Sequence, residues 1–258
     1  MKLEGRTILI TGGTAGIGFA MAGQLARRGN RVAVCGRTPE CVEAAAGAIP
    51  GIRGLVCDVA VEEHRRKLHD RLTDAGWRID VLINNAGIGE ACDFAHTPDA
   101  GERAQREIEI DLIAPLRMTH LFLPALMEAG EAAVINVTSG YALRPAPVAP
   151  GYTAAKSGLH FFTCSLRAQL AGTGVEVFEV LPPMTDTRMT RGAAVHKMSA
   201  AAVARKALRG VERGRREICI GEVRWLKAAA RWGPGWADRV LRHYPVPVRA
   251  VLADAGET

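Results

Sequence analysis

Tyr152 and Lys156 are the pair of residues whose types and spacing most directly suggest chemistry. They lie four positions apart at the start of a predicted helix over residues 153–171, so their side chains emerge on one face of it. An unperturbed tyrosine has a pKa near ~10, and a neighbouring ammonium stabilises the ionised phenolate and lowers that value. The pair therefore predicts a proton donor and acceptor that a lysine tunes toward working pH.

A glycine-rich stretch, TGGTAGIG, runs from Thr11 to Gly18 between a predicted strand over residues 7–11 and a predicted helix over residues 17–28. Glycines permit positive φ angles and let a pyrophosphate approach the backbone, while the N–H groups and dipole of the following helix stabilise its charge. The spacing, GxxxGxG, differs from the common GxGxxG fingerprint. Its place at the first strand-to-helix turn nevertheless predicts a dinucleotide site. The expected contacts are Gly12, Thr14, Gly16, Ile17 and Gly18.

The end of the second predicted strand bears on the choice of dinucleotide. A site that prefers NAD(H) has a carboxylate at this position, which binds the ribose hydroxyls and repels a 2′-phosphate. Here Gly36 leaves the position without a side chain, and Arg37 follows with a planar, permanently charged fork suited to phosphate. The sequence therefore favours NADP(H) over NAD(H).

Asp111 is a carboxylate between Ile110 and Leu112 in a segment otherwise composed for burial, REIEIDLIAPLRM. A buried charge is costly unless it is paired. The sequence alone therefore raises the question of why a carboxylate stands here.

Apolar strand-like runs and helical stretches alternate along the chain, which is typical of a parallel sheet covered on both faces. We predict one doubly wound Rossmann-type α/β domain over residues 1–258 with a seven-stranded parallel sheet. The predicted strands are residues 7–11, 31–35, 55–57, 81–84, 133–137, 175–181 and 217–220. The predicted helices are residues 17–28, 39–48, 61–75, a long region ending at 127, 153–171 and 200–213.

Two segments depart from the alternation. Residues 182–198 carry two prolines and many polar residues after a strand end, which predicts a substrate lid. The tail over residues 222–258 contains three tryptophans among arginines. We expect amphipathic helices there that cover the lid or an oligomer contact, in preference to attachment to a membrane surface.

Composition excludes several classes of protein. The net charge of +6 comes from 33 Lys and Arg that are spread along the chain. Their densest cluster, residues 205–216, alternates with apolar residues as the exposed face of a helix does. Nucleic-acid binding is therefore not expected. The six cysteines form no CxxC pair and show no histidine at a ligand spacing, which predicts reduced thiols and no metal site. No window of roughly 18 apolar residues is found, so a cytoplasmic protein is expected.

Together with TGxxxGxG at residues 11–18, three further motifs make the sequence resemble the short-chain dehydrogenase/reductase family over residues 2–220. They are Asn84-Asn85-Ala86-Gly87 after the fourth strand, Ser139 after the fifth, and Tyr152-x-x-x-Lys156. The resemblance implies further cofactor contacts in several loops. These are Asp58 and Val59 near the adenine, Asn85, Ala86 and Gly87 after the fourth strand, and Pro182, Thr185 and Thr187 near the nicotinamide carboxamide.

The resemblance also implies the catalytic roles. Tyr152 is the general acid/base, its pKa lowered by Lys156 and by an oxidised nicotinamide. Lys156 binds the nicotinamide ribose, and Ser139 donates a hydrogen bond to the substrate oxygen as alkoxide character develops. Asp111 occupies the place of the family's catalytic asparagine. It is expected to be ionised and paired with Lys156 through water, or protonated by burial, or to mark an impaired proton relay.

The leading hypothesis is a reversible NADP(H)-dependent oxidoreductase that acts on a carbonyl or alcohol. Reduction of an imine or enone by the same residues, and a catalytically decayed nucleotide-binding regulator, are the alternatives. The proline-rich wall over residues 141–151 favours a largely apolar small-molecule substrate, although Arg144 and basic lid residues leave an anionic one open. The family suggests a homodimer or homotetramer built on the helices that carry Asp111 and Tyr152.

Overall fold

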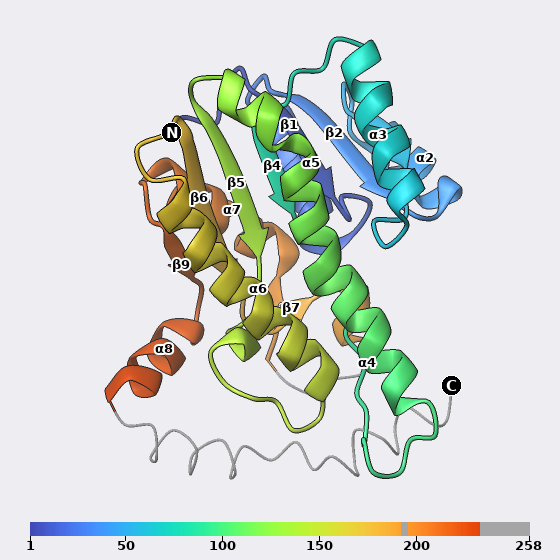
Figure 1. The fold of residues 1–258 in the computed structure, drawn as a ribbon, viewed down its shortest axis with the longest axis vertical. Coiled ribbons are helices and arrows are strands. Elements are labelled where there is room, and N and C mark those ends of the chain that lie inside the picture. Colours follow the sequence, from blue (N-terminus) through green and yellow to red (C-terminus); the bar gives the residue numbers. More distant parts are fainter. Residues whose placement is uncertain (192–195, 233–258) are drawn as a thin grey trace.

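The structure is a computed structural model and describes residues 1–191 and 196–232. Its central feature is a seven-stranded parallel sheet, as predicted (Figure 1). The strand order is β3-β2-β1-β4-β5-β6-β9. In chain order these are β1 (Thr7–Thr11), β2 (Arg31–Gly36), β3 (Arg53–Val56), β4 (Val81–Asn84), β5 (Ala132–Val137), β6 (Val175–Leu181) and β9 (Glu217–Cys219).

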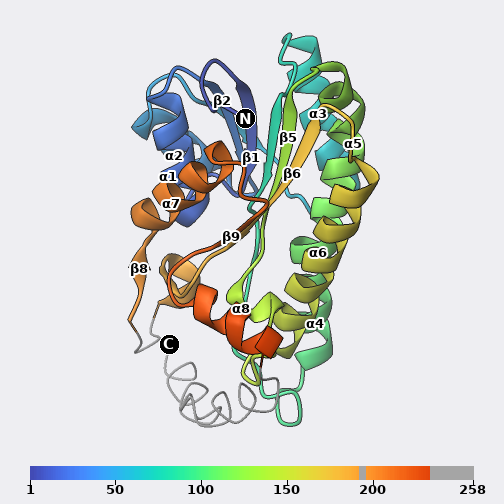
Figure 2. The same cartoon turned by 90° about the vertical axis from the view of Figure 1, so that its left-hand side faces the viewer.

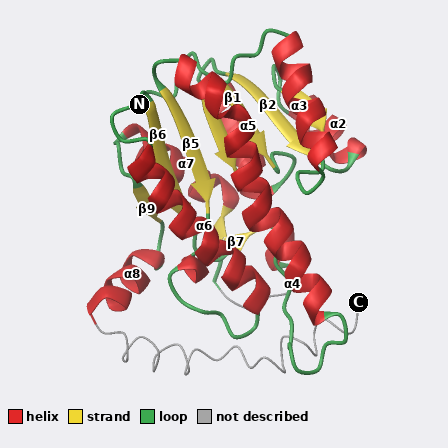
Figure 3. Cartoon of the chain, in the orientation of Figure 1, coloured by secondary structure: helices red, strands yellow, loops and turns green. Residues whose placement is uncertain are grey.

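Helices cover both faces of this sheet, which Figure 2 shows edge-on and Figure 3 shows by secondary structure. One layer contains α1 (Gly16–Ala26), α2 (Pro39–Ala48) and α7 (Ala200–Glu212). The other contains α3 (Glu62–Asp74), α5 (Ala114–Glu128) and α6 (Pro150–Gln169). Each layer has its own apolar core. Ile135 belongs to the core beneath α1 and α7, while its neighbour Val134 belongs to the core beneath α3, α5 and α6.

The strand order reverses between β1 and β4, because successive strands first add on one side of β1 and then on the other. In a doubly wound sheet a ligand binds beyond the carboxyl ends of the strands at such a reversal. The loops that follow β1, β4 and β5 therefore form the expected site.

The element bounds follow the predicted pattern closely. The strands over residues 7–11, 81–84 and 175–181 and the helix over residues 39–48 have the predicted bounds. Gly29, with φ 76°, follows the end of α1 in the left-handed conformation that a non-glycine residue rarely adopts. The β3 strand begins two residues earlier than predicted and α6 begins three residues earlier, at Pro150, whose fixed φ suits the first turn of a helix.

The long predicted helix is divided into three parts: α4 (Ala100–Ile108), a π-helical turn, η1 (Glu109–Ile113), and α5. By length and composition this 29-residue run could cross a membrane, with a mean hydropathy of 1.3 in its most apolar window. The prediction that no such window exists is therefore wrong. Packing explains the apolar composition, since Met118, Phe122 and Leu126 are buried in the core beneath α5.

The predicted lid contains two short parallel strands, β7 (Thr185–Asp186) and β8 (Met198–Ser199), and a 3-10 turn, η3 (Arg188–Thr190). The tail begins with α8 (Val223–Trp232), which lies beside β9. Residues 192–195 of the lid and 233–258 of the tail lie outside the described residues. All six cysteines are free, as predicted.

Candidate active site

The glycine-rich turn after β1 packs directly against the loop after β4. Gly12 and Gly16 have φ angles of 63° and 55°, which a residue with a Cβ rarely adopts. A Cβ on Gly12 would lie 2.7 Å from Cα of Ala86, and one on Gly18 would overlap the amide of Asn85. The glycines are thus required both by backbone conformation and by close contact between the two loops.

Asn85 and Thr11 hold these two loops together. The Asn85 amide donates hydrogen bonds to the carbonyls of Thr11 and Gly12, both at 3.1 Å. The Thr11 hydroxyl accepts from the backbone N–H groups of Asn85 and Ala86, at 3.0 and 3.1 Å. Asn84 has a purely internal role, since its amide donates to Asn136 and Thr119 within the core. The predicted cofactor residues Gly12, Asn85 and Ala86 therefore lie in one rigid wall, with Gly87 following it.

The arrangement fits a dinucleotide phosphate. No side-chain hydrogen bond caps α1, so the backbone N–H groups of Gly16, Ile17 and Gly18 in its first turn have no side-chain oxygen competing for them. These donors, together with the helix dipole, favour an anion at this position. The glycine turn supplies a surface free of Cβ atoms beside them.

The end of β2 also meets the glycine turn. A Cβ on Gly36 would lie 2.8 Å from Cγ2 of Thr14, so a carboxylate side chain at this position would displace Thr14. The Arg37 side chain is exposed next to it. Further along the same edge, Asp58 is half-buried and accepts a hydrogen bond from the N–H of Ala60 at 3.0 Å, while Val59 is buried beside it.

The lid approaches the turn from the opposite side. The methyl group of Thr187 would lie 3.1 Å from a Cβ on Gly16. Thr185 is buried and its hydroxyl donates to the Pro183 carbonyl at 2.7 Å. Pro182 precedes this bend, and its carbonyl accepts from the N–H of Gly140 at 3.3 Å. The residues predicted to surround the nicotinamide therefore lie between the glycine turn and the loop after β5.

Ser139, Tyr152 and Lys156 converge beyond the carboxyl end of β5. The Lys156 ammonium lies 5.6 Å from the centre of the Tyr152 ring and donates to the Val137 carbonyl at 3.2 Å. The Ser139 hydroxyl accepts from the N–H of Tyr141 at 3.2 Å, and a hydrogen bond from Ser139 favours ionised Tyr152. The predicted acid, its lysine and its serine are therefore together.

Asp111 lies on the π-helical turn and is completely buried. Its Oδ1 lies 2.8 Å from Nζ of Lys156, and its Oδ2 accepts from the N–H of Ile88 at 2.9 Å. A side chain on Gly87 would overlap Asp111, so this glycine makes room for the pair. The carboxylate and the ammonium are in direct contact, without the bridging water of the first of the three readings. Burial raises the pKa of Asp111, and the charge of Lys156 and the N–H of Ile88 oppose that rise and favour the ion pair.

This pair changes the acid–base expectation for Tyr152. Burial raises the pKa of Tyr152, Lys156 lowers it, and the negative charge of Asp111 raises it again, so the chain's own groups hold the pKa above its ordinary value. Burial is the main cause of the raised value and Asp111 adds to it, so Lys156 by itself does not lower the pKa below that of a free tyrosine. The further lowering by an oxidised nicotinamide stays a prediction. Burial opposes the charge of Lys156, but Asp111 and Tyr152 outweigh it and raise the pKa of the lysine.

Glu107 is a second buried carboxylate that the sequence analysis missed. It lies one helical turn before Asp111, is 4% exposed, and accepts from the N–H of Glu90 at 2.9 Å. Burial raises its pKa, which hydrogen bonds from the N–H groups of Glu90 and Tyr152 counteract. Glu107 thus joins the loop after β4 to the first turn of α6, which carries Tyr152. Its four-residue spacing from Asp111 was the signal available in the sequence.

The statement that no histidine lies at a ligand spacing from a cysteine overlooks one pair, His160 and Cys164, which are four residues apart on α6. The structure brings them to Glu179 of β6, and the absence of a metal site stays a prediction. The sequence analysis overlooked this spacing because the third group lies on a different element.

Known proteins resemble the chain over most of its length. A family model described as short chain dehydrogenase matches residues 6–197. A Bacillus subtilis protein, uncharacterized oxidoreductase DltE, is 38% identical over 237 residues, covering 90% of this chain and 94% of the relative. A very-long-chain 3-oxoacyl-CoA reductase of Anas platyrhynchos is 32% identical over 193 residues, covering 72% of this chain but only 62% of the relative.

Among solved structures, a short chain dehydrogenase from Burkholderia cenocepacia J2315 in complex with NADP superposes with a TM-score of 0.84 at 28% identity. The match covers 93% of this chain and 99% of that one. The resemblance therefore extends beyond the nucleotide-binding half and includes the segment that carries Tyr152 and Lys156.

Proposed function

Because this chain belongs to the short-chain dehydrogenase/reductase family of oxidoreductases, we propose that it transfers a hydride reversibly between NADP(H) and a carbonyl or alcohol substrate. The observation that carries the proposal is the convergence of Ser139, Tyr152 and Lys156 beside a glycine turn suited to a dinucleotide. The nicotinamide, when bound, supplies the hydride.

The preference for NADP(H) is supported by the end of β2. Gly36 is packed against Thr14, which disfavours the carboxylate that an NAD(H) site uses there. Arg37 presents an exposed guanidinium for the 2′-phosphate. Arg37→Gln is expected to weaken NADPH binding at least tenfold, about 1.4 kcal/mol, and to leave NADH binding within about twofold. Equal weakening of both cofactors, measured by fluorescence titration, would contradict this assignment.

The protein's part in the reaction follows from the site. Tyr152 donates a proton to the substrate oxygen during reduction and removes it during oxidation. The Ser139 hydroxyl donates a hydrogen bond to the same oxygen and stabilises the developing alkoxide. Lys156 holds the charge of the ionised phenolate and is held in place by Asp111 and the Val137 carbonyl.

Asp111 acts here as a positioning residue. One carboxylate oxygen orients Lys156, and the other anchors the loop after β4 through the N–H of Ile88. An asparagine has only one acceptor oxygen and cannot replace both contacts. The cost is electrostatic, because the same negative charge makes Tyr152 harder to ionise.

The substrate is expected to be a largely apolar small molecule. The ring of Tyr152 is flanked by Gly89 and by the edge of the Tyr141 ring, with centroids 6.4 Å apart. These surroundings offer apolar contact and few donors. The acyl chain of a 3-oxoacyl thioester, the substrate class in the relative's name, is apolar beside its ketone, although coenzyme A itself is anionic. A C=N or conjugated C=C bond is the second candidate.

Oxidation of NADPH against a panel of aldehydes, ketones, 3-oxoacyl thioesters and imines tests the proposal. Turnover of at least one carbonyl is expected, and Tyr152→Phe is expected to lower kcat by at least a hundredfold because general acid catalysis contributes about 10²–10⁴. A kcat of Tyr152→Phe equal to that of the parent would refute the role of Tyr152. Turnover of imines alone would favour the second candidate.

We further propose a cytoplasmic homodimer or homotetramer. The exposed side chains of Met127 on α5 and Phe161 on α6, 46% and 69% accessible, supply apolar area for a contact between copies. A mass near 27.6 kDa by light scattering would reject an oligomer.

A further inference from the structure

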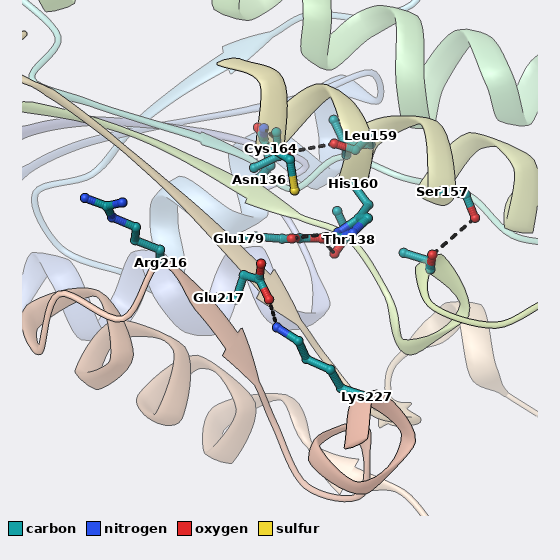
Figure 4. A network of polar contacts seen from close by, with 12 residues as sticks. Asn136, Thr138, Ser157, Leu159, His160, Cys164, Glu179, Arg216, Glu217 and Lys227 are labelled. Atoms are coloured by element: carbon teal, nitrogen blue, oxygen red, sulfur yellow. Dashed lines mark hydrogen bonds and ion pairs between the residues drawn. The ribbon is translucent and has the colours of Figure 1, made fainter. Parts of the chain in front are cut away.

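Beneath α6 lies a compact polar cluster that the proposed reaction does not use. It consists of His160 and Cys164 on the inner side of α6 and Glu179 on β6, and Figure 4 shows the three side chains converging. Their potential ligand atoms, Nδ1, Sγ and a carboxylate oxygen, all lie within 4.8 Å of one another. Helical spacing of four residues places the imidazole and the thiol on one face, and the strand brings the carboxylate to them.

Glu179 is the residue that most needs explanation. Its side chain is completely buried, and an ionised carboxylate is costly to bury unless other groups compensate its charge. The Thr138 hydroxyl donates to Oε1 at 2.7 Å, and Nδ1 of His160 lies 3.0 and 2.9 Å from the two carboxylate oxygens. The carboxylate is thus oriented by a threonine on one side and faces the imidazole on the other.

Two further groups lie beside the cluster. Nη1 of Arg167 lies 4.0 Å from Sγ of Cys164. A second thiol, Cys219, shares the face of the sheet with Glu179, because its strand pairs in register with β6. Burial and the Glu179 charge raise the pKa of Cys219 to about 11, which places this thiol close to the same carboxylate.

We propose that His160, Cys164 and Glu179 bind one Zn²⁺ ion, with water in the fourth position. Thiolate, imidazole and carboxylate are the three ligand types that zinc takes in proteins, at about 2.3, 2.0–2.1 and 2.0–2.2 Å. Ligand atoms of a tetrahedral ion with those bonds lie roughly 3.3–3.8 Å apart. The His160–Glu179 pair opens by a few tenths of an ångström to admit the ion, and the thiol moves inward by no more than about 1 Å.

The charges balance in the bound state. The 2+ charge of the ion is balanced by the Glu179 carboxylate and the Cys164 thiolate. Binding releases the Cys164 proton to solvent, and His160 binds through Nδ1 with its remaining proton on Nε2. Thr138 then acts on the carboxylate from outside the coordination sphere, as groups around metal sites commonly do.

Zinc binding is tested on the full, untagged chain after chelation of bound metal and reduction of the thiols. Competition with a chromophoric chelator is expected to show one Zn²⁺ per chain with a Kd of about 1 µM or tighter. Cys164→Ser and His160→Ala are each expected to weaken binding at least tenfold. Cys41→Ser is the matched control, since Cys41 lies on α2 away from the cluster, and is expected to bind like the parent.

Two further readouts identify the ligands without using enzyme activity. Co²⁺ is expected to give a cobalt–thiolate charge-transfer band in the parent and in Cys41→Ser but not in Cys164→Ser. Zn²⁺, unlike Mg²⁺, is expected to raise the melting temperature of the parent and not that of Cys164→Ser. No binding at about 100 µM Zn²⁺, or unchanged binding in both cluster variants, would overturn the proposal. Because none of these measurements requires turnover, a failure of the proposed oxidoreductase activity is distinguishable from a failure of the zinc site.

Discussion

Replacing Asp111 by asparagine tests the acid–base reasoning most directly. The substitution keeps the shape of the side chain and removes its charge. The asparagine cannot accept from both Lys156 and the N–H of Ile88, so one of the contacts at 2.8 and 2.9 Å is lost. The larger consequence is electrostatic, because the carboxylate is a charge that opposes ionisation of Tyr152.

The distances give the size of the effect. Asp111 lies 2.8 Å from the Lys156 ammonium, which lies 5.6 Å from the centre of the Tyr152 ring, so the carboxylate is at most roughly 8 Å from that centre. Two unit charges at this separation interact by about 2 kcal/mol at an effective dielectric constant of ~20. Since a negative neighbour raises the pKa of a phenol, Asp111→Asn is expected to lower that of Tyr152.

The pH profile of kcat/KM for alcohol oxidation measures this shift, because oxidation needs ionised Tyr152. The acidic limb is expected to move to lower pH, so turnover at pH 7 is retained or increased, by up to about tenfold. Glu109→Gln, on the same π-helical turn, is the matched control that removes a charge without touching Lys156. Two results would refute the reasoning. One is an acidic limb at the same pH as in the parent, and the other is a loss of turnover of more than about tenfold, which is ~1.4 kcal/mol of activation free energy.

Two further substitutions test how the site is held. Glu107→Gln leaves one acceptor oxygen for the two N–H groups of Glu90 and Tyr152, so one hydrogen bond is lost. The free energy of unfolding, measured in urea, is expected to fall by about 1–2 kcal/mol, with a higher substrate KM; a change below about 0.3 kcal/mol would show that Glu107 does not join the loop to α6. Gly18→Ala places a methyl group on the Asn85 amide and is expected to abolish cofactor binding while the chain stays folded by circular dichroism. Gly47→Ala, which meets nothing within 4 Å, is its control, and cofactor binding by Gly18→Ala equal to that of the control would contradict the close contact described.

Most of the fold could be predicted because its signals are local. Buried parallel strands such as β4 and β6 are continuous apolar runs, and turn residues such as Gly29 and Pro39 mark the ends of helices. The π-helical turn could not be predicted, because its sequence has the same periodicity as the helices on either side. The turn places Asp111 against Lys156, a contact with a residue distant in sequence.

The site residues also fall into those that local sequence predicts and those that depend on tertiary contacts. Motif spacing was sufficient to find Tyr152 and Lys156, because two residues on one helix share a face whatever surrounds them. Glu107 and the cluster at Glu179 depend on contacts between elements distant in sequence. The raised pKa of Tyr152 also depends on the fold, since burial and the charge of Asp111 raise it, whereas motif spacing shows only that Lys156 is near.

The π-helical turn over Glu109–Ile113 contains one residue more than a regular α-helix would. This extra residue is expected to lower the stability of the helix while it supports catalysis. In this turn Ala114 donates to the carbonyl of Glu109, five residues back, so the regular hydrogen-bond ladder is interrupted. Deleting one residue would restore an uninterrupted α-helix, and would also rotate one flank by about 100° relative to the other, carrying the carboxylate of Asp111 away from Lys156. A more regular helix and a correctly placed ion pair are thus mutually exclusive in this chain. Selection for thermal stability alone would be expected to remove that residue, and selection for turnover to keep it.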